Sequence, residues 1–371
     1  MSRIKLAAAI AAASLLSMTT GAAAQTKLSY GTYLPANHSI NVAGIQPLAT
    51  RLASESGGKI TLEILSGGVA AKATGAVDSI RDRLVSAGKI TDILVSKQLP
   101  YSSLITQLAL LGKDPLVMGP ATNEFNMLRC PECQEEQKRE GIISMAYYST
   151  TPHILICKQP LRSLEALKGK RVSAVGPYAL MYESFGLVPV NLPHEEGYEA
   201  FQRGQIDCAD AVDAWMRTLS LWEPAKNVLN VDIGTYHGGV AFAMNADLWR
   251  SLPADQRTVI KRNMPVLVGD VLFAYLNDAK SVREEARTSK GVSFLVPDES
   301  VAKALADYRT VELKRVREQA QKSGLKNSDQ LIDTYLGLMA KWEKLNQDEI
   351  KGDKAKLVEV LQREIYAKTS W

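Results

Sequence analysis

Residues 159–212 alternate between short strand patterns and short helix patterns, and this alternation limits the possible folds more than any other feature of the chain. An apolar strand pattern at 172–175 is followed by a helix that ends at Gly186. A second strand pattern at 188–190 then leads through another helix to a strand that begins at Ile206. Strands and helices that alternate with short loops are typical of a parallel sheet in an α/β domain. We therefore predict an α/β fold.

The N-terminal segment, residues 1–24, has the pattern of a signal peptide. Arg3 and Lys5 precede an apolar run at 6–18, and three alanines stand directly before Gln25. The apolar run is shorter than the roughly 20 residues that a membrane span needs. We therefore expect cleavage after the last alanine and a mature protein in the periplasm.

The composition is that of an ordinary globular protein, with 46% hydrophobic and 23% charged residues. The net charge is +4, and it falls to +2 without residues 1–24, which hold two basic residues and no acidic one. This balance, without a basic stripe interleaved with aromatics, argues against nucleic acid as a partner. The remaining 347 residues, 371 less 24, are too many for one ordinary core, so two domains are expected.

The order of the strand patterns predicts that the chain leaves a first sheet and later returns to it. The beginning of the chain is expected to form a β-α-β-α-β unit. Strand patterns near 142–148 and at 239–245 frame the central segment, and a further strand is expected at 228–234. Two lobes connected in this way leave a cleft, where strand ends face the ligand. The unit at the beginning is expected from strands 27–34, 60–64 and 91–96, a helix at 39–56 and a helix ending at Gly88. Lobe I is expected to comprise residues 25–150 and 240–283, and lobe II residues 151–239 and 284–371, with the C-terminal helices.

The central segment resembles, in residue type and spacing, the substrate-binding proteins of tripartite ATP-independent periplasmic (TRAP) transporters, the C4-dicarboxylate-binding-protein-like family. A second stretch, residues 241–260, resembles the return strand and following helix of that family, and the whole resemblance covers about residues 27–320. The residues that carry it in the central segment are Pro160, Leu167 to Lys170, Gly186, Pro189, Tyr198, Ala200, Gly204 and Asp207.

The resemblance implies a periplasmic-binding-protein fold, with two α/β lobes around a ligand cleft, hinge strands and a helical C-terminal region. It also implies a function: capture of a small organic solute, by default an organic acid, and its delivery to the membrane subunits of a TRAP permease. A sensory solute-binding subunit would have the same fold and stays open as an alternative.

The positions that hold the ligand in the family carry other residue types here. The family places an arginine where this chain has Ser173, a second arginine at His153 and an asparagine at Ala211. Arginine pairs with a carboxylate through two parallel hydrogen bonds, and serine cannot neutralise such a charge. We therefore expect an amine, a zwitterion or a neutral polar solute to bind better than a dianion such as succinate.

The candidate ligand-binding residues follow from these positions and from the aromatic and acidic residues around them. Trp215 could instead be a core residue, and Asp213 could instead cap the helix that follows it. The full set is His38, His153, Ser173, Tyr178, Ala211, Asp213, Trp215, Tyr236 and His237.

The cysteines raise one enzymatic alternative. Cys130 and Cys133 form a C-x-x-C pattern, which a periplasmic thiol-disulfide oxidoreductase would use for catalysis and which can also supply half of a zinc site. No second pair lies near it in sequence, so we predict a structural disulfide that caps the helix at 121–129. We expect Cys157 and Cys208, on neighbouring predicted strands, to be buried free thiols. The sequence lacks G-x-S-x-G, H-E-x-x-H and P-loop patterns, and we expect neither a catalytic residue nor a cofactor or bound metal.

Overall fold

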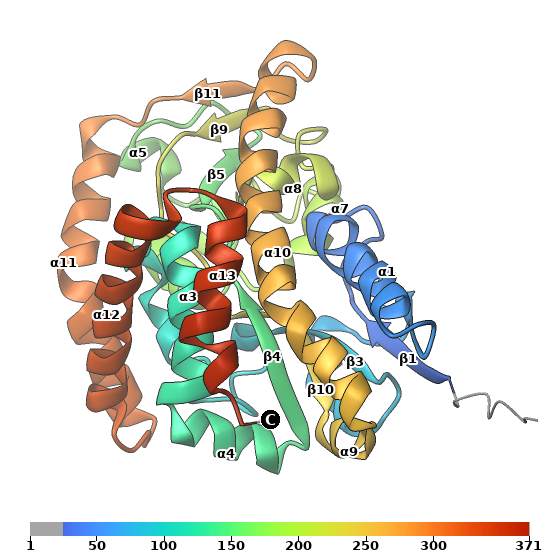
Figure 1. Cartoon of the computed structure of the whole chain (residues 1–371). Helices are drawn as coiled ribbons and strands as arrows, with labels where there is room; N and C mark the ends of the chain where they lie inside the picture. The colour runs from blue at the N-terminus through green and yellow to red at the C-terminus, as the bar shows by residue number, and fades with distance from the viewer. Residues whose placement is uncertain (1–24, 371) are drawn as a thin grey trace, which may run out of the picture.

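The computed structural model describes residues 25–370 and consists of two β-sheets with helices packed around them (Figure 1). The first sheet has the strand order β2-β1-β3-β10-β4, and the second has the order β11-β9-β5-β8-β6-β7. The predicted α/β class, with two lobes, is confirmed. The first sheet consists of β1 (Thr26–Gly31), β2 (Ile60–Leu65), β3 (Ala87–Thr91), β4 (Ile142–Tyr148) and β10 (Gly239–Asn245). The second consists of β5 (Ile154–Cys157), β6 (Arg171–Ser173), β7 (Val188–Val190), β8 (Cys208–Ala211), β9 (Asn227–Leu229) and β11 (Ser293–Leu295).

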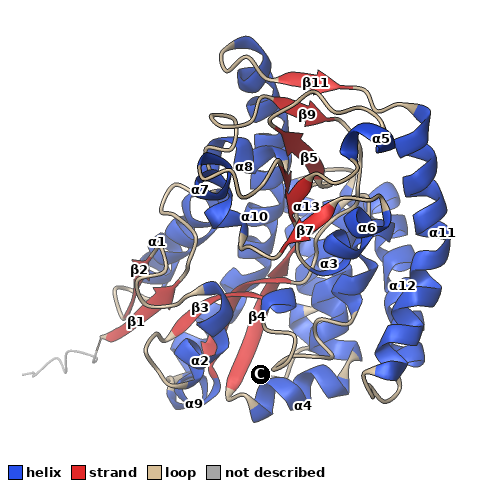
Figure 2. Cartoon of the chain, turned by 180° about the vertical axis from the view of Figure 1, so that it is seen from behind, coloured by secondary structure: helices blue, strands red, loops and turns tan. Residues whose placement is uncertain are grey.

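The helices lie around both sheets, as the colouring by secondary structure shows (Figure 2). The α-helices are α1 (Gln46–Glu55), α2 (Ala76–Arg81), α3 (Pro115–Glu124), α4 (Pro131–Arg139), α5 (Leu164–Leu167), α6 (Gly176–Ser184), α7 (Gly197–Gln202), α8 (Asp213–Thr218), α9 (Ala246–Ser251), α10 (Ala254–Thr288), α11 (Glu299–Lys322), α12 (Ser328–Leu345) and α13 (Lys354–Glu364). The shorter 3-10 and π-helical turns are η1 (Ile40–Ile45), η2 (Ala73–Gly75), η3 (Asp92–Leu94), η4 (Ile105–Leu111), η5 (Phe125–Arg129), η6 (His194–Glu196), η7 (Asn346–Ile350) and η8 (Tyr366–Lys368).

Strand β10 brings the chain back into the first sheet after the central segment. It lies between β3 and β4 and pairs with both in antiparallel orientation, and all its residues are buried. A strand covered on both faces needs apolar or small residues, which Gly239 to Met244 provide, and the polar Asn245 at its end donates to the carbonyls of Ile80 and Arg81. In the second sheet, β6 pairs in parallel with β7 and β8, as the alternation of strand and helix patterns predicted.

Two extended segments cross between the sheets, and they are hydrogen-bonded to each other. The amide of Thr150 donates to the carbonyl of Tyr236, and the amide of His153 donates to that of Gly234, both at 2.8 Å. Gly234 has a φ of +128°, and a Cβ there would lie 2.4 Å from the carbonyl oxygen of Ala109. Only glycine therefore fits at this point of the crossing.

Two strand predictions were wrong in their positions. The expected strand 91–96 is instead β3 at Ala87–Thr91, and the preceding helix ends at Arg81, not Gly88. Gly88 was interpreted as a helix stop, but it lies in β3, where a Cβ would come within 2.8 Å of the carbonyl oxygen of Gly31 on β1. The expected strand 228–234 is short, because β9 ends at Leu229 and the rest belongs to the crossing segment.

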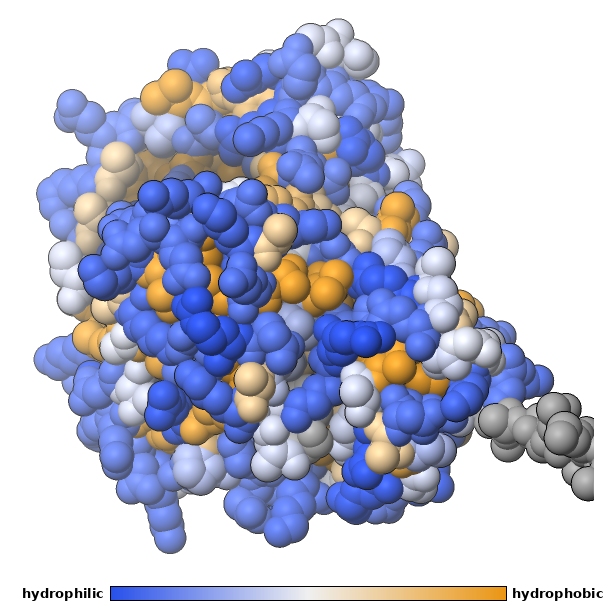
Figure 3. All heavy atoms as spheres, in the orientation of Figure 1, coloured by the Kyte–Doolittle hydropathy of each residue, from blue (hydrophilic) through white to orange (hydrophobic). Residues whose placement is uncertain are grey.

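The C-terminal helices α12 and α13 pack against helices from earlier parts of the chain. Helix α12 packs against α3, and α13 packs against α10. Figure 1 shows α13 in front of α3, and α12 beside α3. Among the helices of residues 25–370, none has the length and the hydrophobicity that crossing a bilayer would need. The face seen in Figure 1 is mainly hydrophilic, with hydrophobic side chains in separate patches (Figure 3). The expected signal peptide lies outside the described residues.

All four cysteines are in disulfides. The predicted Cys130–Cys133 disulfide is confirmed, and it lies at the start of α4, where the Cys130 sulfur accepts from the Cys133 amide. Both residues are fully buried, whereas a thiol that attacks a substrate disulfide must be accessible. The prediction that Cys157 and Cys208 are free thiols was wrong. They are directly opposite each other on the antiparallel strands β5 and β8, with Cα atoms 4.1 Å apart, and are bridged.

Candidate functional site

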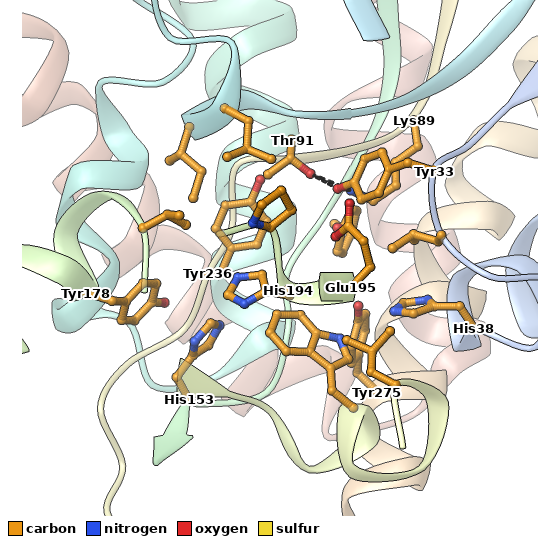
Figure 4. Close-up of a pocket in the computed structure, with 18 residues that line it drawn as sticks. Tyr33, His38, Lys89, Thr91, His153, Tyr178, His194, Glu195, Tyr236 and Tyr275 are labelled. Carbon is orange, nitrogen blue, oxygen red and sulfur yellow. Dashed lines mark hydrogen bonds between the residues drawn. The ribbon is translucent and has the colours of Figure 1, made fainter. Parts of the chain in front are cut away.

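A cavity with an empty volume of about 580 Å³, including the space open to solvent, lies where the two sheets and the crossing segments meet (Figure 4). Its walls are mainly aromatic and aliphatic, with a few charged groups among them. The first sheet and its loops supply Tyr33, Leu34, His38, Lys89, Thr91, Ile93, Leu94 and Tyr148. The elements around the second sheet supply Val175, Tyr178, Pro193, His194, Glu195, Trp215 and Leu219, while His153, Tyr236 and Tyr275 come from the crossing segments and from α10.

The side chain of Lys89 supplies a positive charge to the wall of this cavity. It lies on β3, with 2% of its surface exposed, and its ammonium donates to the hydroxyls of Tyr33 at 2.5 Å and Thr91 at 2.6 Å. The same ammonium lies 4.5 Å from the centre of the Tyr33 ring and 5.6 Å from that of Tyr148, within the range of a cation–π contact. Burial lowers the pKa of Lys89 to about 7, although the charges of Glu195 and Asp92 oppose this shift.

The acidic groups near Lys89 are also affected by burial. Burial raises the pKa of Glu195, against the attraction of Lys89. Burial likewise raises the pKa of Asp92 to about 7. Asp92 accepts hydrogen bonds from the hydroxyls of Tyr236 at 2.9 Å and Thr106 at 2.5 Å, so it fixes the position of the Tyr236 side chain in the cavity wall.

His153 lies at the end of the cavity away from Lys89. Its ring is held by the carboxylate of Asp210, which does not line the cavity. Its Nδ1 lies 2.7 Å from Asp210 on β8, which also accepts a hydrogen bond of 3.1 Å from the Tyr182 hydroxyl. The His153 ring stacks on Tyr178 with centroids 4.2 Å apart, and it meets Trp215 edge-on at 5.5 Å. Figure 4 shows His153 and Tyr178 together, away from Lys89 and Tyr33.

The two remaining histidines of the cavity are neutral at physiological pH. Burial lowers the pKa of His38 to about 3, with a smaller contribution from Lys89. Burial also lowers the pKa of His194 to about 3, with His153 and Lys89 acting in the same direction. The His194 ring lies 4.3 Å from that of Trp215, so it serves mainly as part of the aromatic wall.

The structure brings five of the nine candidate residues to the cavity: His38, His153, Tyr178, Trp215 and Tyr236. The other four lie outside it. Ser173 and Ala211 are buried in β6 and β8, and Asp213 pairs with Arg283 at 2.9 Å instead of capping α8. His237 bonds to the carbonyls of Thr235 and Ile105 and stacks on Tyr335. Among the described residues, no arginine lines the cavity.

Sequence reasoning missed Lys89 and Glu195, the two charged side chains of the wall, together with Tyr33, Tyr148 and Tyr275. For Lys89 a signal exists, because it stands in the segment Ala87–Thr91, which otherwise contains only small, apolar or hydroxyl residues. A lysine inside a buried strand is rare unless its ammonium has a partner. Glu195 offers no such signal, since it stands in the short polar run His194–Glu196, which forms the turn η6.

Comparison with known protein families decides the classification. The family model described as bacterial extracellular solute-binding protein, family 7, matches residues 30–306, most of the chain. This protein belongs to that family. A curated relative, the C4-dicarboxylate-binding periplasmic protein DctP of Shewanella loihica, is 24% identical over 170 residues, which cover 44% of this chain and 50% of that protein.

Solved structures share the fold of this family 7 protein. A TRAP solute-binding protein from Rhodoferax ferrireducens, in complex with copurified benzoate, has a TM-score of 0.77 at 18% identity, over 86% of this chain and 99% of that one. A marine metagenome protein specific for aromatic acids, in complex with metahydroxyphenylacetate, has a TM-score of 0.76 at 19% identity, covering 86% and 100%. A Bordetella bronchiseptica protein with bound mandelate has a TM-score of 0.74 at 17% identity, covering 86% and 99%.

Proposed function

We propose that the mature protein is a periplasmic solute-binding protein of a TRAP transporter, which binds a small organic acid with one carboxylate and a ring. It would then deliver this acid to the membrane permease. One observation carries the proposal: a buried ammonium, that of Lys89, lies in a cavity whose other walls are mainly aromatic.

The ammonium of Lys89 suits one carboxylate. It has three N–H groups, of which two are used by the hydroxyls of Tyr33 and Thr91, so one remains for a ligand oxygen. A carboxylate here would offset the cost of burying the ammonium. The expectation of an amine or neutral solute rested on the missing arginines at positions 153 and 173 and did not consider Lys89. A dianion would still lack a second cation, so the preference against succinate stays.

The walls suit a ring. Tyr178, Trp215, Tyr236 and Tyr275 present flat faces or edges to the cavity, and aromatic pairs favour offset-stacked or edge-to-face contacts. Three structures of similar fold hold benzoate, mandelate and metahydroxyphenylacetate, each of which combines an aromatic ring with a single carboxylate. Their ligands agree with what these walls and the Lys89 ammonium would accept.

Binding would also drive closure of the two lobes. Lys89 belongs to the first sheet, while Tyr178 and Trp215 belong to elements of the second lobe. A ligand that touches all three binds the closed arrangement better than the open one, and this difference in affinity shifts the equilibrium toward closure. Recognition of the closed form by a permease would then couple binding to delivery.

Titration calorimetry on protein stripped of bound ligand by unfolding and refolding tests the proposal. The panel is benzoate, mandelate, 3-hydroxybenzoate, pyroglutamate, succinate, malate and phenylethylamine. We expect at least one ring monocarboxylate to bind in the micromolar range or tighter, and succinate and phenylethylamine to bind far more weakly. Binding only of dianions or only of the amine would contradict the proposal. Loss of solute uptake on deletion of neighbouring permease genes would separate transport from a sensory role.

A further inference from the structure

Two polar atoms at the end of the cavity opposite Lys89 have no hydrogen-bond partner within residues 25–370: Nε2 of His153 and the hydroxyl of Tyr178. Both side chains are 1% exposed, and both line the cavity. A buried polar group without a partner costs free energy, so native proteins nearly always satisfy such groups with protein, water or ligand. Two of them side by side in a ligand cavity indicate a polar group of the ligand.

Asp210 determines what His153 offers to that ligand. Its carboxylate lies 2.7 Å from Nδ1 and is itself fully buried, so Nδ1 carries the proton and donates to Asp210. In the neutral imidazole, Nε2 is then a hydrogen-bond acceptor directed away from Asp210. Asp210 is therefore a positioning residue that fixes both the tautomer and the ring orientation.

Tyr178 supplies a hydrogen-bond donor beside the acceptor Nε2 of His153. Its ring stacks on that of His153 with an angle of 6° between the planes, and Figure 4 shows both side chains at the same end of the cavity. The phenol O–H can donate, while Nε2 of His153 accepts. A hydroxyl group on a ligand donates one hydrogen bond and accepts others, so it can satisfy both atoms at once.

From this pair we propose that the His153–Tyr178 end of the cavity recognises a hydroxyl group on the ring of the bound acid, which makes the ligand a hydroxylated ring monocarboxylate. The ligand hydroxyl donates to Nε2 of His153 and accepts from the hydroxyl of Tyr178, while its carboxylate lies at Lys89. This inference rests on the proposed function, since it assumes an organic acid in the cavity.

Calorimetry with matched ligands tests the inference: benzoate, 3-hydroxybenzoate, 4-hydroxybenzoate and the corresponding methoxybenzoates. We expect one hydroxybenzoate to bind the wild type at least about tenfold more tightly than benzoate, because a site built for a hydroxyl leaves buried groups unpaired with the analogue that lacks it. The methoxy analogue should lose this advantage, because it cannot donate to His153.

Variants test whether the preference for a hydroxylated ligand depends on Nε2 of His153 and on the hydroxyl of Tyr178. Tyr178→Phe removes only the unpaired hydroxyl and retains the stacking on His153, so it should reduce the hydroxyl preference several-fold. His153→Phe should abolish the preference, and circular dichroism checks its fold because it leaves Asp210 without its main partner. Tyr308→Phe, the same chemical change at a residue that does not line the cavity, is the control and should leave the ratio of affinities unchanged.

The outcomes separate this inference from the proposed function. Equal binding of benzoate and both hydroxybenzoates to the wild type would overturn the inference and leave the proposed function intact. A hydroxyl preference that survives in a folded Tyr178→Phe and in a folded His153→Phe would also overturn it. Failure of every ring monocarboxylate to bind would overturn both.

Discussion

Replacement of Lys89 by methionine is the sharpest test of how this cavity holds an anion. Methionine has a similar length and fills the same space, and its sulfur can contact the rings of Tyr33 and Tyr148 favourably. The change therefore removes the charge and its hydrogen bonds while largely preserving the packing. The variant should therefore bind the acid more weakly without being less stable than the wild type.

The loss of affinity follows from the geometry of the ammonium. One N–H of Lys89 is left for the ligand after those donated to Tyr33 and Thr91. A hydrogen bond between charged groups contributes about 1.5–3 kcal/mol, which corresponds to a roughly 10- to 150-fold weaker affinity for the acid in Lys89→Met. The stability of the ligand-free protein should stay equal or rise, because the wild type buries a charge that is only partly compensated.

The pH dependence of binding gives an independent readout. The pKa of Lys89 is about 7 because of burial, and a bound carboxylate raises it, so binding above that pH takes up a proton. Affinity of the wild type should be flat below pH 7 and fall toward about tenfold per pH unit above it. Lys89→Met should lose most of this pH dependence. A small part should remain because of Asp92, whose pKa burial also raises to about 7.

Calorimetry at several pH values measures the affinity and its pH dependence, and thermal unfolding of the ligand-free proteins measures their stability. Lys59→Met is the matched control, because the Lys59 side chain is 44% exposed, pairs with Asp255 at the surface and does not line the cavity. It should change neither affinity nor its pH dependence. If Lys89→Met folds and binds the acid within about twofold of the wild type, the assignment of the carboxylate to Lys89 is refuted.

The remaining predictions concern the disulfides, the N-terminus and the charge of the ligand. Loss of the Cys157–Cys208 bridge, which closes a loop of 51 residues, should lower the free energy of unfolding by about 4 kcal/mol in denaturant titrations. Loss of the Cys130–Cys133 bridge, with a separation of 3, should lower it by about 2 kcal/mol, because a shorter loop restricts the unfolded chain less. The reverse order would contradict the chain-entropy reasoning. Neither loss should change solute affinity, whereas insulin reduction that depends on Cys130 and Cys133 would favour the oxidoreductase. Mass spectrometry of the periplasmic protein should find Gln25 as its first residue, and a chain that retains Met1 would disprove export with cleavage. Succinate should bind at least about tenfold more weakly than the best monocarboxylate, because its second carboxylate would be buried without a cation.

The sequence was sufficient for the fold because long apolar patterns determine where strands and helices form. The exit from the first sheet near residue 150 and the return at Gly239 followed from such patterns. The pairing of Cys157 with Cys208 could not be predicted with the same certainty, since it depends on register. Shifting β5 by one residue against β8 would turn the two side chains to opposite faces.

The cavity was less predictable, because its walls come from segments far apart in the chain. His153 was found through a position that carries an arginine in the family, and the structure places it at the cavity. Ser173 was found by the same reasoning and lies outside it. Lys89 was missed because the start of β3 was placed too late, so the lysine seemed to follow a helix instead of lying inside a buried strand. Whether a side chain in a strand faces a cavity depends on that register, which composition does not determine.

Helix α10 restricts the directions in which the cavity can open. Its 35 residues contact η1, α1 and β4, which belong to the lobe of the first sheet, and α8, which belongs to the lobe of the second. Asp278 in its C-terminal half accepts from Ser39 at 2.5 Å and pairs with Arg217 of α8 at 3.4 Å, so a single side chain is bonded to both halves of the molecule. A continuous helix resists stretching, which disfavours a straight separation of the halves. Solute entry should therefore require a rotation about an axis close to α10, with the mouth of the cavity opening on the side away from that helix.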